Sequence, residues 1–241
     1  MAKRKLKTHG LVKLDNNLID ARLNLSAQGK KIVLFAAKVL QQNEVKVTSQ
    51  TVLIKTTITA LAEFLGLGAD SHRFIRSTLQ ELQKTLITLQ KPHSVVDLVL
   101  MYRAEYFEDG RIELTFAKDL QPLFADMKEK YTGLLLGEVL RLRSKYALRI
   151  YELCMMLHNR DYKRKEYTLK ELKELWGIPP KHTWGQICER VLEPAKKELD
   201  EKCKISFKYQ AKFKADGVGR PRVESVIIDV VENRPQPSLF S

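Results

Sequence analysis

The segment Leu61-Ala62-Glu63-Phe64-Leu65-Gly66-Leu67 returns 111 positions further along the chain as Leu172-Lys173-Glu174-Leu175-Trp176-Gly177-Ile178. In both copies apolar residues recur at the spacing of one helical face, and a glycine follows where the helix would end. The apolar helices on either side also repeat, at an offset of 118 before the segment and 113 after it. Chance seldom preserves three helices in order, so we predict two copies of one structural unit.

The first copy has the element order helix, strand, short helix, longer helix and hairpin. Its expected elements are helix 25–42, strand 45–55, helix 60–65, helix 73–86, and a hairpin of strands 95–106 and 111–116 around Asp109-Gly110. The second copy has helices 144–159, 169–176 and 183–202, and a hairpin of strands 205–213 and 222–231 around Asp216-Gly217. This order is typical of a winged helix. We predict an α+β fold of two tandem winged-helix domains related by an internal repeat, against the alternative of one α+β domain with accidental self-similarity.

The repeat divides the chain into consecutive parts. In order along the chain we expect a basic arm over residues 1–15, an N-terminal winged helix over 16–123, a linker over 124–142, a C-terminal winged helix over 143–231, and a tail over 232–241. The tail is expected to be flexible, because the chain turns polar and proline-rich after Val231.

The composition favours a polyanionic partner. Lys and Arg number 42 and Asp and Glu 29 among 241 residues, which gives a net charge of +13. Nucleic acid is the first candidate and an anionic membrane surface the second. No apolar run approaches the roughly 20 residues of a membrane helix, and the cysteines and histidines lack the spacing of disulfide or metal sites. We expect a protein of a reducing cytoplasm that binds no membrane, no metal and no cofactor.

Sequence motifs of catalysis are missing as well. The chain contains no P-loop, no complete dinucleotide fingerprint, no zinc-protease or serine-hydrolase motif, and no His cluster such as a DNA-nicking enzyme uses to hold its metal. We therefore expect a binding protein rather than an enzyme, and a nuclease is the disfavoured third alternative.

The candidate DNA contacts lie on the polar faces of the two longer helices and on the second hairpin. A recognition helix reads bases in the major groove, where Arg suits guanine and Gln suits adenine, whereas hairpin cations suit phosphates. The candidates are Arg73, Arg76, Gln80 and Lys84 in the first copy, Lys181, His182, Gln186, Arg190 and Lys197 in the second, and Lys212, Lys214, Arg220 and Arg222 on the hairpin. For each of these residues the alternative is an ordinary solvated surface.

Two further features bear on this interface. Another basic patch, made of Arg160, Lys163, Arg164 and Lys165, precedes the second helix-turn-helix. Trp184 is compatible with base stacking, but we expect it in the core because it shares the face of Ile187 and Val191.

At this point the sequence resembles the initiator Rep proteins of iteron-bearing, theta-replicating bacterial plasmids. The segments that carry the resemblance are Asn17–Arg22 with Leu25-Ser26, Arg143-Ser144-Lys145-Tyr146-Ala147-Leu148-Arg149-Ile150-Tyr151-Glu152-Leu153, and Arg190-Val191-Leu192-Glu193-Pro194-Ala195-Lys196-Lys197-Glu198-Leu199. The resemblance extends from about residue 16 to residue 231 and agrees with the internal repeat.

The resemblance implies a function that composition does not show. As monomers, proteins of this family bind direct repeats at the origin, with one winged helix on each half of a repeat. As dimers, they bind an operator inverted repeat and repress their own gene. They open an AT-rich segment, recruit the host initiator, helicase and chaperones, and have no catalysis of their own. The resemblance also implies a homodimer formed through the first winged helix, for which Val95–Met101 is the candidate strand, and a bacterial cytoplasm. The alternative for that strand is burial within its own domain.

The tail contains one further motif. Gln236, Ser238, Leu239 and Phe240 resemble the pentapeptide by which bacterial replication proteins bind the sliding clamp. An extended peptide can bury Leu239 and Phe240 while the Gln236 amide makes directional hydrogen bonds. Clamp binding is therefore one hypothesis and an inert tail the other. An inert tail would favour the runner-up function, a winged-helix transcriptional repressor without a replication role.

Overall fold

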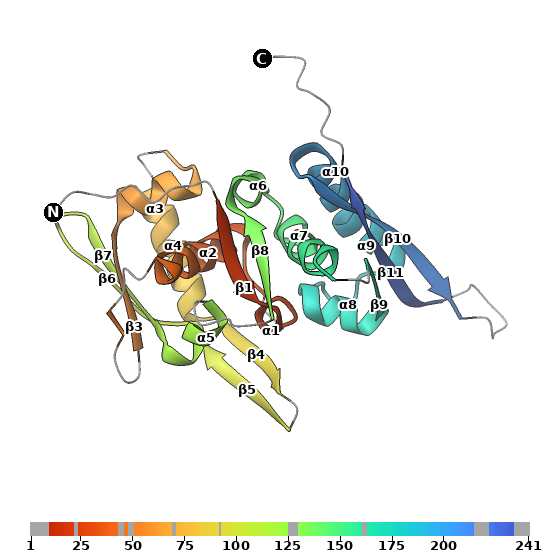
Figure 1. Cartoon of the computed structure of the whole chain (residues 1–241), viewed down its shortest axis with the longest axis horizontal. Coiled ribbons are helices and arrows are strands. Elements are labelled where there is room, and N and C mark those ends of the chain that lie inside the picture. The colour runs from red at the N-terminus through yellow and green to blue at the C-terminus, as the bar shows by residue number, and fades with distance from the viewer. Residues whose placement is uncertain are drawn as a thin grey trace, which may run out of the picture. The chain divides into compact units, whose positions relative to one another are not determined.

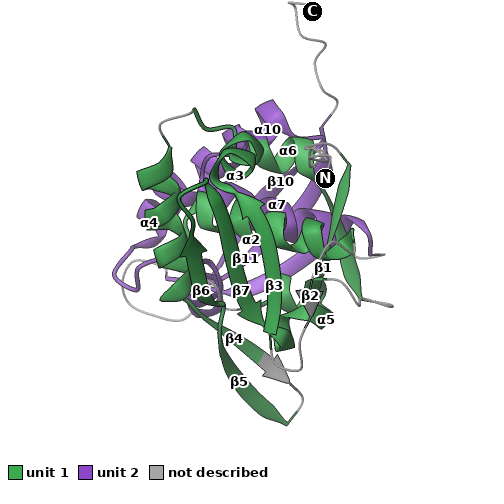
Figure 2. Cartoon of the chain, turned by 90° about the vertical axis from the view of Figure 1, so that its left-hand side faces the viewer, with its two compact units in different colours: residues 1–140 green, residues 141–241 purple. Residues whose placement is uncertain are grey.

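The computed structural model describes residues 10–21, 24–42, 46–47, 51–68, 71–91, 93–124, 130–160, 163–214 and 222–233. The chain forms two compact units, Met1–Leu140 and Arg141–Ser241 (Figure 2), whose elements can be followed in Figure 1. Within the described ranges no helix has the length and apolar character needed to cross a bilayer. The same ranges contain no group of three or more His, Cys, Asp or Glu side chains placed to hold a metal ion.

The first unit contains a winged helix. Its helices are α2 (Ala27–Gln41), α3 (Ile58–Leu65) and α4 (His72–Gln83), and its strands are β2 (Lys46–Val47), β3 (Thr51–Thr57), β6 (Met101–Tyr106) and β7 (Arg111–Ala117). The strands pair antiparallel in the order β2-β3-β7-β6, so the strand before α3 lies beside the second strand of the hairpin. Gly110 has a φ of +81° in the hairpin turn, as the Asp109-Gly110 pair predicts.

The repeated segment forms a short capped helix in this unit. The Thr57 side chain accepts a hydrogen bond from the backbone N–H of Ala60 at 3.0 Å, and Gly66 ends α3 in the left-handed conformation. The Phe64 ring of α3 meets the Phe35 ring of α2 edge-on at 5.1 Å, and both rings are buried. This contact fixes the short helix against the long one.

The second unit repeats this arrangement. Its helices are α7 (Lys145–His158), α8 (Leu169–Trp176), α9 (Trp184–Ile187) and α10 (Glu193–Lys202), with the π-helical turn η2 (Cys188–Leu192) between the last two. Its strands β9 (Arg164–Thr168), β10 (Ile205–Phe213) and β11 (Val223–Glu232) pair in the order β10-β11-β9. Gly177 ends α8 in the left-handed conformation, as Gly66 ends α3. The prediction of two winged-helix domains is confirmed.

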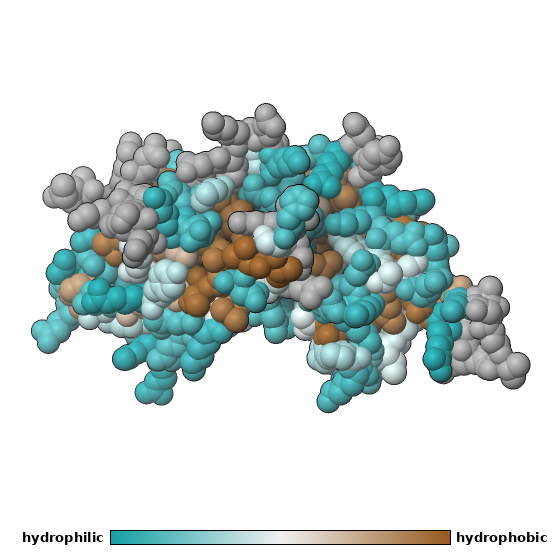
Figure 3. Space-filling view, turned by 90° about the horizontal axis from the view of Figure 1, so that it is seen from below, coloured by the Kyte–Doolittle hydropathy of each residue, from teal (hydrophilic) through white to brown (hydrophobic). Residues whose placement is uncertain are grey.

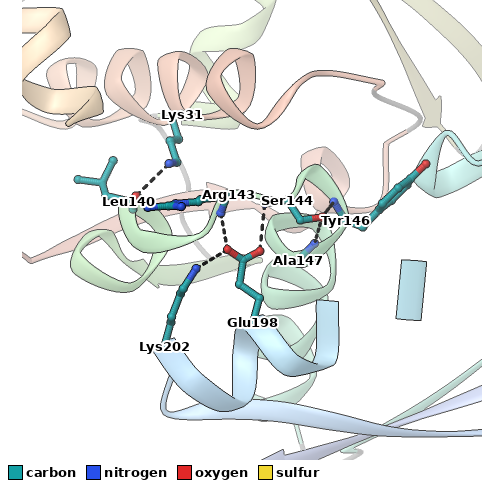
Figure 4. Close-up of polar contacts among 8 residues, drawn as sticks. All are labelled: Lys31, Leu140, Arg143, Ser144, Tyr146, Ala147, Glu198 and Lys202. Carbon is teal, nitrogen blue, oxygen red and sulfur yellow. Dashed lines mark hydrogen bonds and ion pairs between the residues drawn. The ribbon is translucent and has the colours of Figure 1, made fainter. Parts of the chain in front are cut away.

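Glu81 of α4 and Glu198 of α10 each bind the N-terminus of the first helix of the winged helix in their own unit, α2 and α7. Glu81 accepts hydrogen bonds from the backbone N–H of Ser26 at 2.6 Å and from its hydroxyl at 2.7 Å. Glu198 accepts the backbone N–H groups of Arg143 and Ser144 at 2.7 and 3.0 Å (Figure 4). Ser26 and Ser144 are the N-caps of α2 and α7. The same contact thus recurs in both units.

This recurrence changes the alignment of the two longer helices. Glu81 and Glu198 are 117 positions apart, whereas the apolar spacing predicts an offset of 113. At 117 the buried side chains coincide as Ile75 with Leu192, Thr78 with Ala195, and Leu82 with Leu199. The apolar pattern misplaces the offset by about one turn, because successive turns of a helix present the same face. Compared with α4, the helix formed by α9, η2 and α10 therefore has its additional residues at the N-terminal end, in α9 and at the start of η2.

The expected basic arm and linker are wrong over residues 11–15 and 131–141. Strand β1 (Leu11–Asp15) pairs antiparallel with β8 (Tyr131–Leu135), and Val12, Leu14 and Leu134 are fully buried. The remaining elements here are α1 (Asn16–Ile19), the 3-10 turn η1 (Lys118–Leu120), α5 (Gln121–Phe124) and α6 (Leu136–Arg141). The Lys31 ammonium donates a hydrogen bond to the carbonyl of Leu140 at 2.9 Å and so holds α6 to α2 (Figure 4).

Residues 84–106 also differ from the expected helix and hairpin. Helix α4 ends at Gln83, and β4 (Leu86–Lys91) pairs with β5 (Ser94–Val99) as a separate ribbon that projects from the unit (Figure 1). The expected single strand 95–106 breaks at Leu100, whose side chain is buried and whose N–H binds the carbonyl of Thr85 at 3.1 Å. The winged-helix hairpin therefore begins only at Met101.

Candidate nucleic-acid interface

Helix α4 presents all of its predicted DNA contacts on the surface. Ile75, Thr78, Leu79 and Leu82 are buried, and the opposite face exposes Arg73, Arg76 and Gln80, with Lys84 at the C-cap. The Arg76 guanidinium lies 5.1 Å from the centre of the Tyr106 ring of β6. Burial raises the pKa of Tyr106, and the charge of Arg76 partly opposes this shift. Arg76 is thus held against the sheet, whereas Arg73 and Gln80 extend outward.

Although Phe74 is a large apolar residue of this amphipathic helix, the structure leaves it 46% exposed. Ile75, Leu79 and Leu82 already fill the buried face, so the first turn of α4 shows an aromatic ring beside Arg73. With about 3.6 residues per turn, Phe74 lies at the edge of the stripe that Ile75, Leu79 and Leu82 form, so angular position and not polarity determines its exposure.

In the second unit the candidate recognition helix consists of α9, η2 and α10, and a capping box fixes its start. The Thr183 hydroxyl accepts the N–H of Gln186 at 3.3 Å, and the Gln186 side-chain oxygen accepts the N–H of Thr183 at 2.9 Å. A bidentate contact to adenine needs the Gln186 side-chain oxygen as an acceptor as well as its amide nitrogen as a donor. The cap thus fixes the Gln186 oxygen toward Thr183 and away from a base, which weakens the adenine-reading prediction.

The other predicted contacts of this helix lie at the surface to different degrees. Lys181, Arg190 and Lys197 are exposed, and His182 is half-buried. Arg190 belongs to the π-helical turn that ends just before Glu193-Pro194. Because proline donates no backbone hydrogen bond, the regular helical pattern is interrupted at this point, and the wider turn re-aims the side chains that precede it.

Trp184 is neither fully buried nor free to stack on a base. It is half-buried, and its ring meets that of Tyr209 on β10 edge-on at 6.1 Å. The Tyr209 hydroxyl donates to the Glu193 carboxylate, and burial together with this hydrogen bond raises the pKa of Tyr209. Trp184 and Tyr209 therefore join the recognition helix to the hairpin, so the core prediction for Trp184 holds only in part.

The hairpin of the second unit carries the expected cations, and Lys212 is paired with an acid of the protein itself. Lys212, Lys214 and Arg222 are exposed, whereas Arg220 lies outside the described residues. The Lys212 ammonium lies 2.6 Å from the Glu166 carboxylate of β9, and this contact holds the pKa of Glu166 below its usual range. Part of the hairpin charge is thus neutralised by the protein itself.

The basic patch before α8 is compensated in the same way. Arg164 binds Asp229 at 2.6 Å, and Lys163 lies 3.5 Å from Glu232. Both acids belong to β11, whose other residues are mostly apolar. Apart from Lys212, the predicted hairpin contacts that the structure describes are Lys214 and Arg222, and both lie at its far end. The tail residues Gln236, Ser238, Leu239 and Phe240 lie outside the described residues.

Comparisons with known proteins agree with this architecture. The family model described as Initiator Replication protein, WH1, matches residues 11–155, and that described as Initiator Rep protein, WH2, matches residues 168–230. The first match begins where β1 begins. A search of curated protein sequences finds no match to the chain.

Among solved structures the chain is similar to the Pi initiator protein, which was crystallised in complex with iteron DNA. The TM-score is 0.69 at 18% sequence identity, and the alignment covers 97% of this chain and 100% of that one. At this level of identity the likeness shows a shared fold, and the function has to be argued from the residues of the site.

Proposed function

Because the chain belongs to the family of initiator replication proteins, we propose that it initiates replication of a bacterial plasmid by binding direct repeats, or iterons, at the origin as a monomer. The observation that carries the proposal is the exposed polar face of the longer helix in each of the two winged-helix units. Two such helices fit two stretches of major groove, so one chain reads one repeat with one unit on each half. Opening of an AT-rich segment follows from this binding.

Different residues are proposed to supply the affinity for DNA and the preference for its sequence. Lys214, Arg222 and Lys212 on the hairpin supply phosphate contacts, which give affinity and register. Arg73 and Arg190 on the recognition helices supply contacts to guanine edges, which give sequence preference. The net charge of +13 adds long-range attraction to the duplex.

We also propose that the protein represses its own gene as a homodimer through the β4–β5 ribbon. Val95 and Leu86 are 59% and 56% exposed on this ribbon. Figure 3 views the side on which this ribbon projects and shows apolar side chains exposed there among hydrophilic ones. Leu100 and Met101 are buried, so the candidate strand Val95–Met101 contributes only through residues 95–99. Two ribbons that pair across an operator inverted repeat would remove this apolar surface from water.

Recruitment of host proteins completes the proposed function. The tail motif Gln236-x-Ser238-Leu239-Phe240 is proposed to bind the sliding clamp, and other surfaces the host initiator, helicase and chaperones. Binding of purified clamp to the full chain and to a chain that ends at Asn233 tests the tail. Clamp binding by the full chain alone supports the motif, and equal binding by both chains, or none by either, contradicts it.

Fluorescence anisotropy with the DNA that lies beside the gene tests the main proposal. We expect tight binding to duplexes that carry direct repeats, and weak binding to scrambled duplexes of the same composition. The logarithm of the binding constant should fall linearly with the logarithm of salt concentration, with a slope of about −0.9 for each phosphate neutralised. Binding to a single palindrome, with none to direct repeats, would instead support the alternative of a transcriptional repressor without a replication role.

A further inference from the structure

Phe213 is a large apolar side chain on the basic hairpin of the second unit. It is 55% exposed at the end of β10, between Lys212 and Lys214 in sequence. The N–H of Lys214 binds the carbonyl of Arg222 at 2.9 Å, so a third cation lies across the ribbon at the same level. A partner that offers both negative charge and apolar surface would complement this combination of a phenyl ring and cations.

The alternation of β10 shows which side of the ribbon the ring occupies. Phe207 is buried, and Tyr209 contacts Trp184 and Glu193 of the recognition helix, so the odd-numbered side chains face that helix. Phe213 follows them on the same face, beyond the reach of the core. Lys212 lies on the opposite face, where it binds Glu166.

The pairing of the two strands supports the ring from across the ribbon. Phe213 is opposite the half-buried Val223, and the register shifts between Lys212 and Phe213, which leaves Glu224 as the extra residue of β11. A shift of this kind increases the local twist and re-aims side chains near a binding site. Phe213 and Val223 therefore form a small apolar wedge, and Lys214 and Arg222 follow it toward the end of the ribbon.

We propose that Phe213, backed by Val223, enters the minor groove next to the major groove that the recognition helix occupies, and kinks the duplex at one base step. This rests on the proposed function. Double-stranded DNA is the partner that fits, since its minor groove offers sugars and base edges between two rows of phosphates. Apolar side chains inserted from the minor groove unstack a base step and bend DNA by about 20–90°. A kink placed beside the bound repeat would assist the separation of the strands.

Bending of a repeat duplex, measured by energy transfer between dyes at its two ends, tests the wedge at saturating protein. The wild-type chain should bend the duplex, Phe213→Ala should lose most of the bend, and Phe213→Leu should keep it. The matched control is Lys212→Met on the opposite face, which should weaken binding to all sequences and leave the bend unchanged. Thermal unfolding should show equal stability for Phe213→Ala and the wild type, because the ring is exposed.

A second readout locates the kink. 2-Aminopurine placed along the half-site should brighten at one step with the wild-type chain and stay quenched with Phe213→Ala. A Phe213→Ala protein that bends and unstacks DNA like the wild type overturns the wedge. The same measurements on a scrambled duplex at low salt separate the two proposals. A bend that depends on Phe213, without preference for repeats, supports the wedge and contradicts the proposed function.

Discussion

Glu198 shows how a single carboxylate ties the recognition helix to the rest of its unit. It binds the N–H groups of Arg143 and Ser144 and the ammonium of Lys202, the last at 2.6 Å. Burial raises the pKa of Glu198, but the hydrogen bonds from Lys202 and from the two backbone N–H groups outweigh it and leave this pKa lowered. The folded state therefore favours the charged carboxylate.

The first prediction concerns Glu198→Gln. Replacing the carboxylate weakens hydrogen bonds to a charged acceptor, so the free energy of unfolding at pH 7 should fall by about 1–3 kcal/mol. Because the folded pKa is lowered, the stabilisation is complete above the unfolded pKa of about 4.3 and is lost as pH falls through the folded pKa. Urea unfolding of both proteins from pH 7 to pH 3 should show their difference shrinking below about pH 4.5.

The control for this prediction is Glu201→Gln, a change at an exposed position of the same helix. It should alter stability by less than about 0.5 kcal/mol at every pH. Equal effects of the two substitutions would mean that the cap at Ser144 contributes nothing.

The second prediction concerns Glu166, which neutralises part of the hairpin charge. The carboxylate binds Lys212 and accepts the hydroxyl of Ser225. Glu166→Gln removes one negative charge near the phosphates, so affinity for DNA of any sequence should rise, by up to about fivefold. Anisotropy titrations on repeat and scrambled duplexes should show the same increase, with the preference for repeats unchanged. A gain confined to the repeat duplex would show that Glu166 takes part in reading the sequence.

At the scale of elements, the β4–β5 ribbon carries the third prediction. Val95→Asp places a charge in the proposed dimer interface, and the exposed position means that the fold of the monomer should tolerate it. The monomer–dimer dissociation constant, measured by analytical ultracentrifugation, should rise by at least about tenfold, because desolvating an unpaired carboxylate costs more than 1 kcal/mol.

The control for the ribbon is Leu11→Asp, which changes an aliphatic side chain of similar exposure on β1. This variant should dimerise like the wild type. A protein with Val95→Asp that dimerises normally would exclude the ribbon from the interface and leave its exposed apolar side chains unexplained.

Helices and strands differ in how far the sequence predicts them here. The glycine-ended helices α3 and α8 and the long helices α2 and α7 follow from local periodicity and capping, and the structure confirms them. The β1–β8 pair joins five-residue strands more than a hundred positions apart, so no local pattern reveals it. For the same reason the sequence does not separate β5 from β6, since the break at Leu100 depends on a hydrogen bond to Thr85.

The candidate site shows the same division. Polarity and helical spacing suffice to place Arg73, Gln80, Arg190 and Lys197 on the surface. Polarity does not reveal that Gln186 is occupied in a capping box or that Lys212 faces Glu166, because these depend on distances between side chains. Periodicity also misses the exposure of Phe213, since the β10–β11 hairpin extends beyond the helices that would cover this side chain.

At the scale of the whole molecule, the internal repeat makes a prediction that neither unit makes alone. If each unit reads one half of a repeat, Arg73→Ala should relax base preference in one half and Arg190→Ala in the other, each by about 1–3 kcal/mol at one position. The two arginines lie on different units, so the double variant should lose the sum of the two effects within about 0.5 kcal/mol. Competition binding with repeats substituted one base pair at a time gives both the position and the size of each loss. Losses in the same half would contradict the assignment of one unit to each half-site, and a uniform loss across all positions would make both arginines phosphate contacts.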